Sequence, residues 1–400
     1  MTVYRLENAL QRYDWGSTSA LQGVLGLPVD GRPAAELWLG AHPQGPSVVH
    51  LPGGRDVGLA ELIRADPYGV MGAGVVDAYG PRLPYLLKLL AADRALSLQV
   101  HPQPHRARAG FNAENRRGIA LDDPQRTYRD DQAKPEMVVA LSRFEVLSGF
   151  RRPQRILTLL DGLPGDLVAS IRAALQSRPT AAGISQAFAL AVRAGQSSDG
   201  AADLALTVAA VADRFEAGSD SPRADETVVA LAEQHPGDPG AVVSLMLNRL
   251  TLRPGEAMFV PSGHVHAYLS GCAVEVMASS DNVLRAGLTH KRVDVDALLD
   301  CADFQPGPAA RPRTVPLGGD LVNYRATTRE FGLVVGRPGA DSTTLPARGP
   351  RVLVVVDGEV EVTTSGGVQK FTSGESIVVP HSAGSLTVRG GGLLALSYVP

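Results

Sequence analysis

The sequence predicts a mainly β protein into which an α-helical domain is inserted. Over about the first 150 residues, Gly and Pro interrupt the chain about every ten positions, with short apolar or alternating runs such as ALSLQVHP and EMVVAL between them. This texture is typical of an antiparallel sandwich or barrel. From Pro153 to about Leu250, apolar residues recur at helical spacing in segments such as DLVASIRAALQS, which predicts a helical insert. Short strand-like runs separated by Gly and Pro then resume and continue to the end of the chain.

An internal repeat indicates that the β parts form two related modules. The segments LRPGEAMFVP and FTSGESIVVP align Gly255 with Gly374 and Pro261 with Pro380, so that each reads as a glycine turn, a strand and a Pro-led turn. Chance similarity of two such units is the alternative. The resulting domain prediction is a first module in two parts (1–152 and 249–304), a helical insert (153–248), a Pro-rich linker (305–316) and a second module (317–400).

The composition argues against several classes of partner. The 400 residues carry 38 basic and 41 acidic side chains, a formal net charge of −3, whereas proteins that bind nucleic acid or anionic membranes usually carry a basic excess. No apolar run reaches the ~20 residues needed to cross a bilayer, and the start lacks the layout of a secretion signal. The two cysteines, Cys272 and Cys301, cannot form a disulfide framework. We expect a cytoplasmic monomer without nucleic-acid or membrane partners.

The run ALSLQVHP carries side chains suited to a metal site. Strand alternation places Ser97, Gln99 and His101 on one face, and ligands two residues apart on a strand point into the same space. The alternative is a polar strand face in contact with water.

A second metal-binding pattern lies in GEAMFVPSGHVH. From Gly255 to His266 this segment matches the pattern of the cupin family, a family of small β barrels in which a Gly and a Pro fix the strand that directs a metal-binding His inward. His266 occupies that position, and His264 is its competitor on spacing alone.

Charged residues in two other segments complete a candidate site. Glu136 follows a Pro and precedes an apolar strand, so its carboxylate can reach a barrel mouth and supply the anion that Gln and His ligands lack. Arg285 and Lys291, in the segment SSDNVLRAGLTHK, favour an anionic substrate such as a phosphate or a carboxylate. A surface Glu and a solvated basic loop are the alternatives.

Four of these segments together resemble a known family. ELWLGAHP, LPYLLKLLAADRALSLQVHP, KPEM and HAYLSGCAVEVMASSDNVLRAGLTHK closely resemble, in order and spacing, the motifs of type I mannose-6-phosphate isomerases. The resemblance covers about 300 residues, and the helical insert and the second module fit it as well.

The resemblance implies a zinc enzyme of the cupin fold that interconverts mannose 6-phosphate and fructose 6-phosphate through a cis-enediol. The zinc ligands it implies are Gln99, His101, Glu136 and His266. Its catalytic arginine falls on Arg285, and its motif lysines fall on Lys88, Lys134 and Lys291, which are three of only four lysines in the chain.

Roles for the remaining site residues follow from the chemistry of the isomerisation. A base must come within ~3 Å of the proton that moves between the first two sugar carbons. Glu275, which alternates with Ala273 and Met277, is our candidate base, and a metal-activated water or a lysine such as Lys134 competes with it. We expect Ser97, Lys88 and Lys291 to bind the substrate, with Lys291 and Ser97 as the candidates for its phosphate.

The sequence departs from the family pattern before the KPE motif. Ala133 stands where many members have a His, and His290 is the residue that could stand in for it. Two rival functions also remain open at this stage. They are another metal-dependent cupin enzyme, such as a dioxygenase, and a non-catalytic sugar-phosphate-binding cupin.

The second module is predicted to bind no metal, so we expect one zinc per chain. Ser385 occupies the place after Pro380 that His266 occupies after Pro261. His381 follows Pro380 directly, and the segment has no partner pair like Gln99 and His101.

Overall fold

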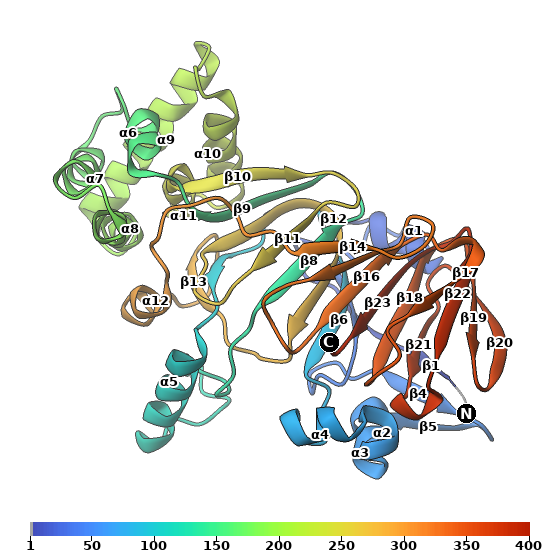
Figure 1. The fold of residues 1–400 in the computed structure, drawn as a ribbon. Coiled ribbons are helices and arrows are strands. Elements are labelled where there is room, and N and C mark those ends of the chain that lie inside the picture. Colours follow the sequence, from blue (N-terminus) through green and yellow to red (C-terminus); the bar gives the residue numbers. More distant parts are fainter. Residues whose placement is uncertain (1–2) are drawn as a thin grey trace.

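The computed structural model describes residues 3–400 and confirms a mainly β fold of two cupin-type antiparallel modules with a helical insert. The two modules lie side by side, and the insert projects from the first module on the side away from the second (Figure 1). Within the described residues, no helix is long and apolar enough to span a membrane.

The first module is a ten-stranded sheet system centred on the long strand β12 (His266–Ala278). The other strands are β2 (Ala9–Gln11), β3 (Glu36–Leu39), β6 (Tyr85–Ala92), β7 (Leu98–Val100), β8 (Glu136–Ala140), β9 (Phe144–Phe150), β10 (Leu247–Leu252), β11 (Ala257–Val260) and β13 (Leu284–Gly287). The early part of β12 pairs with β7 and β9, and its later part pairs with β6 and β8. Between these parts lies Gly271, at φ +108°, where a Cβ would come within 2.3 Å of Arg143 O. Glycine therefore lets one strand join both halves of the module.

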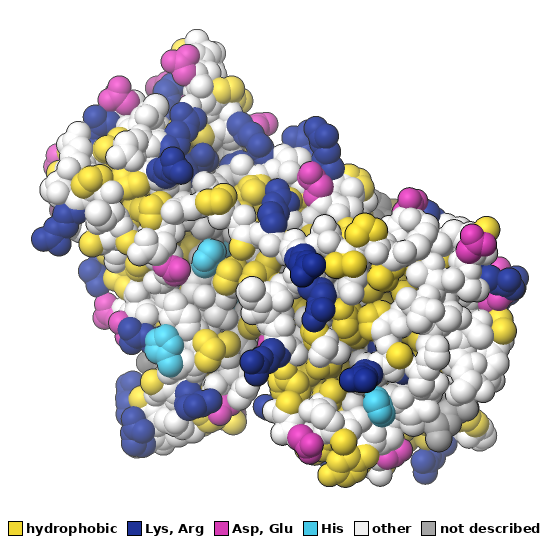
Figure 2. Space-filling view, in the orientation of Figure 1, with side chains coloured by type: hydrophobic (Ala, Val, Ile, Leu, Met, Phe, Trp, Pro, Cys, Tyr) yellow, Lys and Arg dark blue, Asp and Glu magenta, His cyan; other side chains and the backbone are white. Residues whose placement is uncertain are grey.

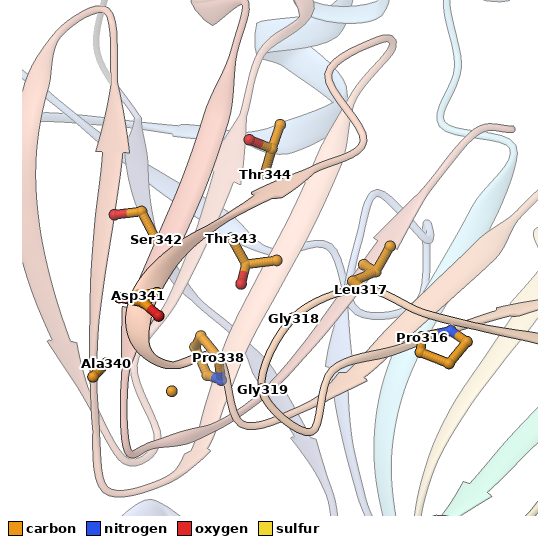
Figure 3. A pocket seen from close by; sticks show the side chains of 11 residues that line it. Pro316, Leu317, Gly318, Gly319, Pro338, Ala340, Asp341, Ser342, Thr343 and Thr344 are labelled. Atoms are coloured by element: carbon orange, nitrogen blue, oxygen red, sulfur yellow. The ribbon is translucent and has the colours of Figure 1, made fainter.

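The second module packs a nine-stranded sheet on a four-stranded one. The larger sheet contains β14 (Arg313–Pro316), β15 (Val322–Arg325), β16 (Gly332–Gly336), β18 (Arg351–Asp357), β21 (Ser376–Val379), β23 (Leu393–Tyr398), β1 (Tyr4–Glu7), β4 (Val48–Leu51) and β5 (Arg55–Gly58). The smaller contains β17 (Gly339–Leu345), β19 (Glu359–Thr364), β20 (Gly367–Thr372) and β22 (Leu386–Gly390). Strand β17 and the turn that follows β14 line a pocket of about 530 Å³ that carries Asp341 but neither His nor Cys (Figure 3).

The two modules share strands and a seam. Although β1, β4 and β5 come from the range assigned to the first module, β1 pairs with β21 of the second, with Tyr4 opposite Val378. The predicted linker also runs along the first module, because Ala310 O accepts a hydrogen bond from Phe259 N at 2.9 Å. The end of that linker forms β14. Basic side chains gather on the surface where the modules meet, among them Arg313 and Arg325 in a groove of about 710 Å³ (Figure 2).

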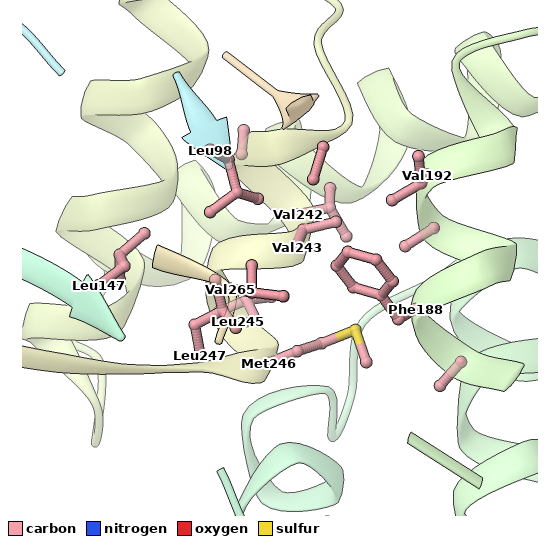
Figure 4. Packing of buried hydrophobic residues seen from close by; sticks show 14 of the residues in the cluster. Leu98, Leu147, Phe188, Val192, Val242, Val243, Leu245, Met246, Leu247 and Val265 are labelled. Carbon is pink, nitrogen blue, oxygen red and sulfur yellow. The ribbon is translucent and has the colours of Figure 1, made fainter. Parts of the chain in front are cut away.

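The helical insert consists of six helices and ends in a 3₁₀ turn. They are α6 (Pro153–Leu159), α7 (Asp166–Ser177), α8 (Ala181–Ala194), α9 (Ser198–Glu216), α10 (Pro222–Gln234), α11 (Gly240–Val243) and η1 (Ser244–Met246). Proline opens α6 and α10, where its missing N–H would have no partner in any case. Phe188 of α8 packs with Met246 and Val242, in one apolar cluster with strand residues Leu98 and Leu147 (Figure 4). The insert is therefore joined to the strands beneath it by a continuous core.

Shorter helices lie around the modules. They are α1 (Ala20–Leu25), α2 (Leu59–Ala65), α3 (Pro67–Met71), α4 (Ala73–Tyr79), α5 (Pro104–Arg116), α12 (Val295–Cys301) and the 3₁₀ turn η2 (His381–Ala383). In η2, His381 Nδ1 accepts a hydrogen bond from Gly349 N at 3.1 Å, so this ring is engaged by the backbone of its own module.

Candidate active site

Three buried side chains meet where the strands of the first module converge. His101 follows β7, Glu136 begins β8 and His266 begins β12, and none is more than 2% exposed. The Glu136 carboxylate lies between the two rings, with Oε1 3.1 Å from His101 Nε2 and Oε2 3.2 Å from His266 Nε2. The ligand atoms of all three residues lie within 4.8 Å of one another.

The geometry of this cluster fits a divalent metal ion. Despite the short contacts, neither Nε2 atom finds a hydrogen-bond partner among residues 3–400, because the contacts to the carboxylate lack hydrogen-bond angles. The opposite ring nitrogens are already engaged: His101 Nδ1 lies 2.7 Å from Asn282 O, and His266 Nδ1 lies 3.1 Å from His264 O. A carbonyl oxygen only accepts, so each ring donates from Nδ1 and turns the lone pair of Nε2 towards the cluster. Burial lowers the pKa of His101 to about 4, which keeps that ring neutral. Two neutral imidazoles and a carboxylate are a ligand set suited to Zn²⁺.

Strand β7 brings two more of the predicted residues beside the cluster. Gln99 pairs in register with His266 of β12 and with Arg285 of β13, and directly opposed residues share a face of the sheet. The register of β13 shifts between Arg285 and Gly287, and such a bulge bends the strand and redirects its side chains. The amide of Gln99 is therefore placed on the ligand face, and Arg285 lies next to it.

Arg285, Arg129 and Lys291 form a basic rim beside these residues. Burial and the charge of Arg129 lower the pKa of Arg285. Arg285 in turn is the main reason that the pKa of Lys291 is lowered, with burial second, while Asp14 opposes the shift. Each positive charge in this rim disfavours the protonated form of the neighbouring cations. An anion bound at the rim would relieve that repulsion and would be stabilised by all three charges.

A second buried cluster, which we call the polar floor, consists of Glu36, Lys88, Glu275 and Tyr268. Lys88 of β6 directly opposes Glu275 of β12, and its Nζ lies 3.1 Å from Glu275 Oε2 and 3.4 Å from Glu36 Oε1. Burial disfavours the charge on Lys88, but the surrounding carboxylates outweigh it and raise the pKa of Lys88. Burial raises the pKa of Glu275, against the opposing charge of Lys88. The Tyr268 hydroxyl donates to Glu136 Oε2 at 3.4 Å and also faces Glu275, so the polar floor reaches the ligand cluster.

The loop before β13 is held by Asp130. The Asp130 carboxylate accepts hydrogen bonds from Ser280 Oγ at 2.9 Å and from Asp281 N at 2.7 Å. Asn282, which is fully buried, donates from Nδ2 to Asp130 O at 2.8 Å. Since Asn282 O receives the hydrogen bond of His101, this network fixes the orientation of a ligand.

Known proteins resemble this chain over its whole length. A family model for the catalytic domain of type I phosphomannose isomerases matches residues 3–153. The mannose-6-phosphate isomerase of Escherichia coli (strain K12) is 35% identical over 400 residues, which cover 99% of each chain. This chain belongs to the type I phosphomannose isomerase family. The Bos taurus mannose-6-phosphate isomerase is 33% identical over 387 residues, covering 90% of this chain and 89% of its own.

Solved phosphomannose isomerase structures share the fold. A variant of the Salmonella typhimurium enzyme superimposes with a TM-score of 0.91 at 31% identity, and both chains are covered completely. A zinc-bound mannose 6-phosphate isomerase superimposes with a TM-score of 0.90 at 32% identity, again over the full length of both chains.

The structure also locates the predicted residues that lie outside the cluster of His101, Glu136 and His266. His264 faces Asp303, with 3.9 Å between Nε2 and Oδ2, so the structure brings His266 and not His264 to the cluster. The ring of His290 lies beside that of His235, with centroids 6.3 Å apart, in a separate pocket at the insert. That His290 stands in for the side chain that Ala133 lacks stays a prediction. Ser97 is half-buried just before β7.

Several residues of the site carry no role in the sequence prediction, namely Glu36, Arg129, Asp130, Tyr268 and Asn282. Glu36 lies in the quoted segment ELWLGAHP, but its pairing with Lys88 depends on the register between β3 and β6. Tyr268 lies two residues after His266 on the same strand, so alternation was the available signal for it. Asn282 acts partly through its backbone carbonyl, for which a sequence carries no signal.

Proposed function

We propose that this chain is a zinc-dependent aldose–ketose isomerase that interconverts mannose 6-phosphate and fructose 6-phosphate. The observation that carries the proposal is the buried His101–Glu136–His266 cluster with two unpartnered Nε2 atoms, adjoined by the basic residue Arg285. The family membership gives the reaction, since the relatives are named for it.

In this proposal His101, Glu136 and His266 hold one zinc ion, with the Gln99 amide oxygen as a fourth ligand. When bound, zinc supplies a fixed positive charge that polarises substrate oxygens. A neutral amide and two neutral imidazoles leave most of that charge uncompensated, because Glu136 is the one anionic ligand of the four.

The chain's own residues handle the proton and the developing charge. In the open form of mannose 6-phosphate, a base removes the proton from C2, which gives a cis-enediolate. A proton is then delivered to C1 and the hydroxyl proton of O2 passes to O1, so that the carbonyl moves from C1 to C2 with no net gain or loss of protons. We assign Glu275 as the base for this transfer, because burial raises the pKa of Glu275 towards the range in which a carboxyl both takes and returns a proton. Arg285 stabilises the enediolate charge, since a guanidinium stays protonated throughout the cycle. Lys134, whose Nζ lies 3.3 Å from Glu136 Oε1, is the competing proton carrier.

The phosphate group is assigned to Lys291 and Ser97. Lys291 is the exposed cation of the basic rim, and Ser97 lies just before β7, the strand that carries Gln99. Lys88, which the sequence suggested for substrate binding, has its ammonium shared between Glu275 and Glu36, and we assign it to holding Glu275 in place. A monomer in the cytoplasm is part of the same proposal.

The test is a coupled assay of mannose 6-phosphate conversion with the metal-loaded enzyme. Turnover that is lost with a chelator and restored by zinc supports the proposal. Binding of mannose 6-phosphate without turnover would instead identify a sugar-phosphate sensor, and oxygen consumption would identify a dioxygenase.

A further inference from the structure

The turn between Arg285 and Lys291 is held in a strained conformation. Leu288 has φ +54° and is the one non-glycine residue with positive φ in the described part of the chain. A branched side chain disfavours this left-handed region, and such a residue persists where its surroundings hold it. Leu288 is also buried, at 2% exposure, in the apolar cluster that the insert shares with the strands.

Asp238, at the end of the helical insert, supplies the hydrogen bonds that hold this turn. Its Oδ1 accepts from Leu288 N at 2.7 Å, and its Oδ2 accepts from Thr289 N at 3.2 Å. The same carboxylate accepts from Gly240 N at 2.7 Å, which anchors it to the start of α11. These hydrogen bonds connect to the basic rim, because Thr289 Oγ1 accepts a hydrogen bond from Lys291 N at 3.1 Å.

Two glycines allow the turn and the insert to come this close. A Cβ on Gly287 would lie 2.7 Å from Asp238 Oδ1 and 3.0 Å from the Cα of Gly240. A Cβ on Gly240 would lie 2.8 Å from the side chain of Leu288. The backbones therefore pack directly on each other, and movement of one side requires movement of the other.

We propose that Asp238 is a positioning residue, through which the helical insert sets the affinity of the active site for the substrate phosphate. Asp238 is not among the residues assigned to the metal or to the substrate. It fixes the amides of residues 288 and 289, and through Thr289 it fixes the direction from which Lys291 leaves the turn. This inference rests on the proposed function where that assigns Lys291 to the phosphate.

The experiment compares Asp238→Ala and Asp238→Asn with Asp203→Ala in the zinc-loaded enzyme. Asp203 is the matched control, because it too accepts a backbone N–H within the insert, from Leu167 at 2.9 Å, but far along the chain from the turn. We expect Asp238→Ala to raise KM for mannose 6-phosphate about tenfold and to leave kcat within about twofold, because an uncapped turn weakens a contact made equally in ground and transition states. Asp238→Asn keeps one acceptor oxygen, so its KM should lie between those of wild type and Asp238→Ala. Asp203→Ala should leave KM unchanged.

Two readouts without turnover accompany the kinetics. Inorganic phosphate, titrated calorimetrically into the zinc-loaded protein, should bind more weakly to Asp238→Ala by the same factor as the change in KM. Amide hydrogen exchange in peptides covering residues 284–291 should be faster in Asp238→Ala and unchanged in Asp203→Ala. Faster exchange with unaltered KM and phosphate affinity would overturn the proposal, as would an equal rise in KM in the Asp203→Ala control.

The failure of the proposed function would look different. If wild-type protein converted no mannose 6-phosphate, the phosphate titration and the exchange measurement would still decide the positioning role. If Lys291→Ala bound phosphate as tightly as wild type, the route through Lys291 would be wrong, and with it this inference.

Discussion

Replacing Lys88 by Met separates two roles for this lysine. The Lys88 ammonium lies 3.1 Å from Glu275 Oε2 and 3.4 Å from Glu36 Oε1, and all three side chains are at most 8% exposed. Removal of one partner from a buried ion pair leaves an uncompensated charge and typically costs about 3–5 kcal/mol. Methionine fills much of the volume of the lysine side chain, so the loss of unfolding free energy in this variant comes mainly from removal of the charge. We therefore expect Lys88→Met to lower the free energy of unfolding by about that amount.

Urea unfolding followed by tryptophan fluorescence measures this loss. Trp38 is a suitable probe, because Lys88 Nζ lies 5.4 Å from its ring centroid and its Nε1 donates to Glu36 Oε2 at 2.6 Å. A Trp15→Phe background leaves Trp38 as the only tryptophan. The matched control is Lys370→Met, which removes an ammonium from the exposed pair with Glu359. Salt and water screen such a pair, so this control should leave the urea midpoint unchanged.

The destabilisation caused by Lys88→Met should increase as the pH rises from mild acid to neutral. Burial raises the pKa of Glu275 in the folded state above its unfolded value, and loss of Lys88 removes the charge that opposes this shift. A carboxyl group whose pKa is higher in the folded than in the unfolded protein stabilises the fold at pH values below its unfolded-state pKa. This stabilisation is lost as the pH rises through its folded-state pKa. Lys88→Met should therefore be most destabilising at neutral pH and least so in mild acid. A variant with the wild-type urea midpoint at every pH and only a raised KM would refute the pairing and return Lys88 to substrate binding.

The other predictions concern the residues around the metal. Arg285→Ala should lower kcat and kcat/KM together by ~10²–10³ with zinc content intact by elemental analysis, because its charge is assigned to the transition state; a near-normal kcat would contradict this. Lys291→Ala should raise KM and spare kcat, and a ~100-fold slower turnover at saturation would make it catalytic instead. His266→Ala should lose both zinc and activity, whereas His264→Ala and His381→Ala should keep one zinc per chain. The assignment of a single site would be disproved if wild type held two zinc ions tightly and His381→Ala lost one of them.

Local sequence patterns predict the fold class and the ligand candidates because both depend on short-range geometry. Strand alternation places Gln99 and His101 on one face, and the glycine and proline around β11 fix where His266 begins its strand. The structure brings His101, Glu136 and His266 into one cluster. The choice of His266 over His264 rests on the cupin spacing, because residues two apart on a strand would share a face; in the structure His264 lies before β12 begins.

The rest of the site depends on contacts between distant segments, which no local pattern specifies. The pairing of Lys88 with Glu275 requires the register of β6 against β12, and the pairing with Glu36 requires that of β3 against β6. In the same way, β1 completes the sheet of the second module by pairing with β21 at the other end of the chain. A motif lysine in the sequence therefore reads equally well as a phosphate ligand or as the partner of a buried carboxylate.

The charges of the buried site give a reason why its ligand cluster and polar floor occur together. Glu36, Glu136 and Glu275 are all buried, and two ammonium groups, those of Lys88 and Lys134, are paired with them. Three carboxylates and two ammonium groups leave one negative charge in a medium of low dielectric, which repels the phosphate and the enediolate alike. A divalent cation between His101 and His266 changes the sign of this balance and leaves the site complementary to an anionic substrate. In the proposed site these buried carboxylates would be tolerated because the ligand cluster receives a cation, and the basic rim of Arg285, Arg129 and Lys291 would extend that positive potential to the entrance.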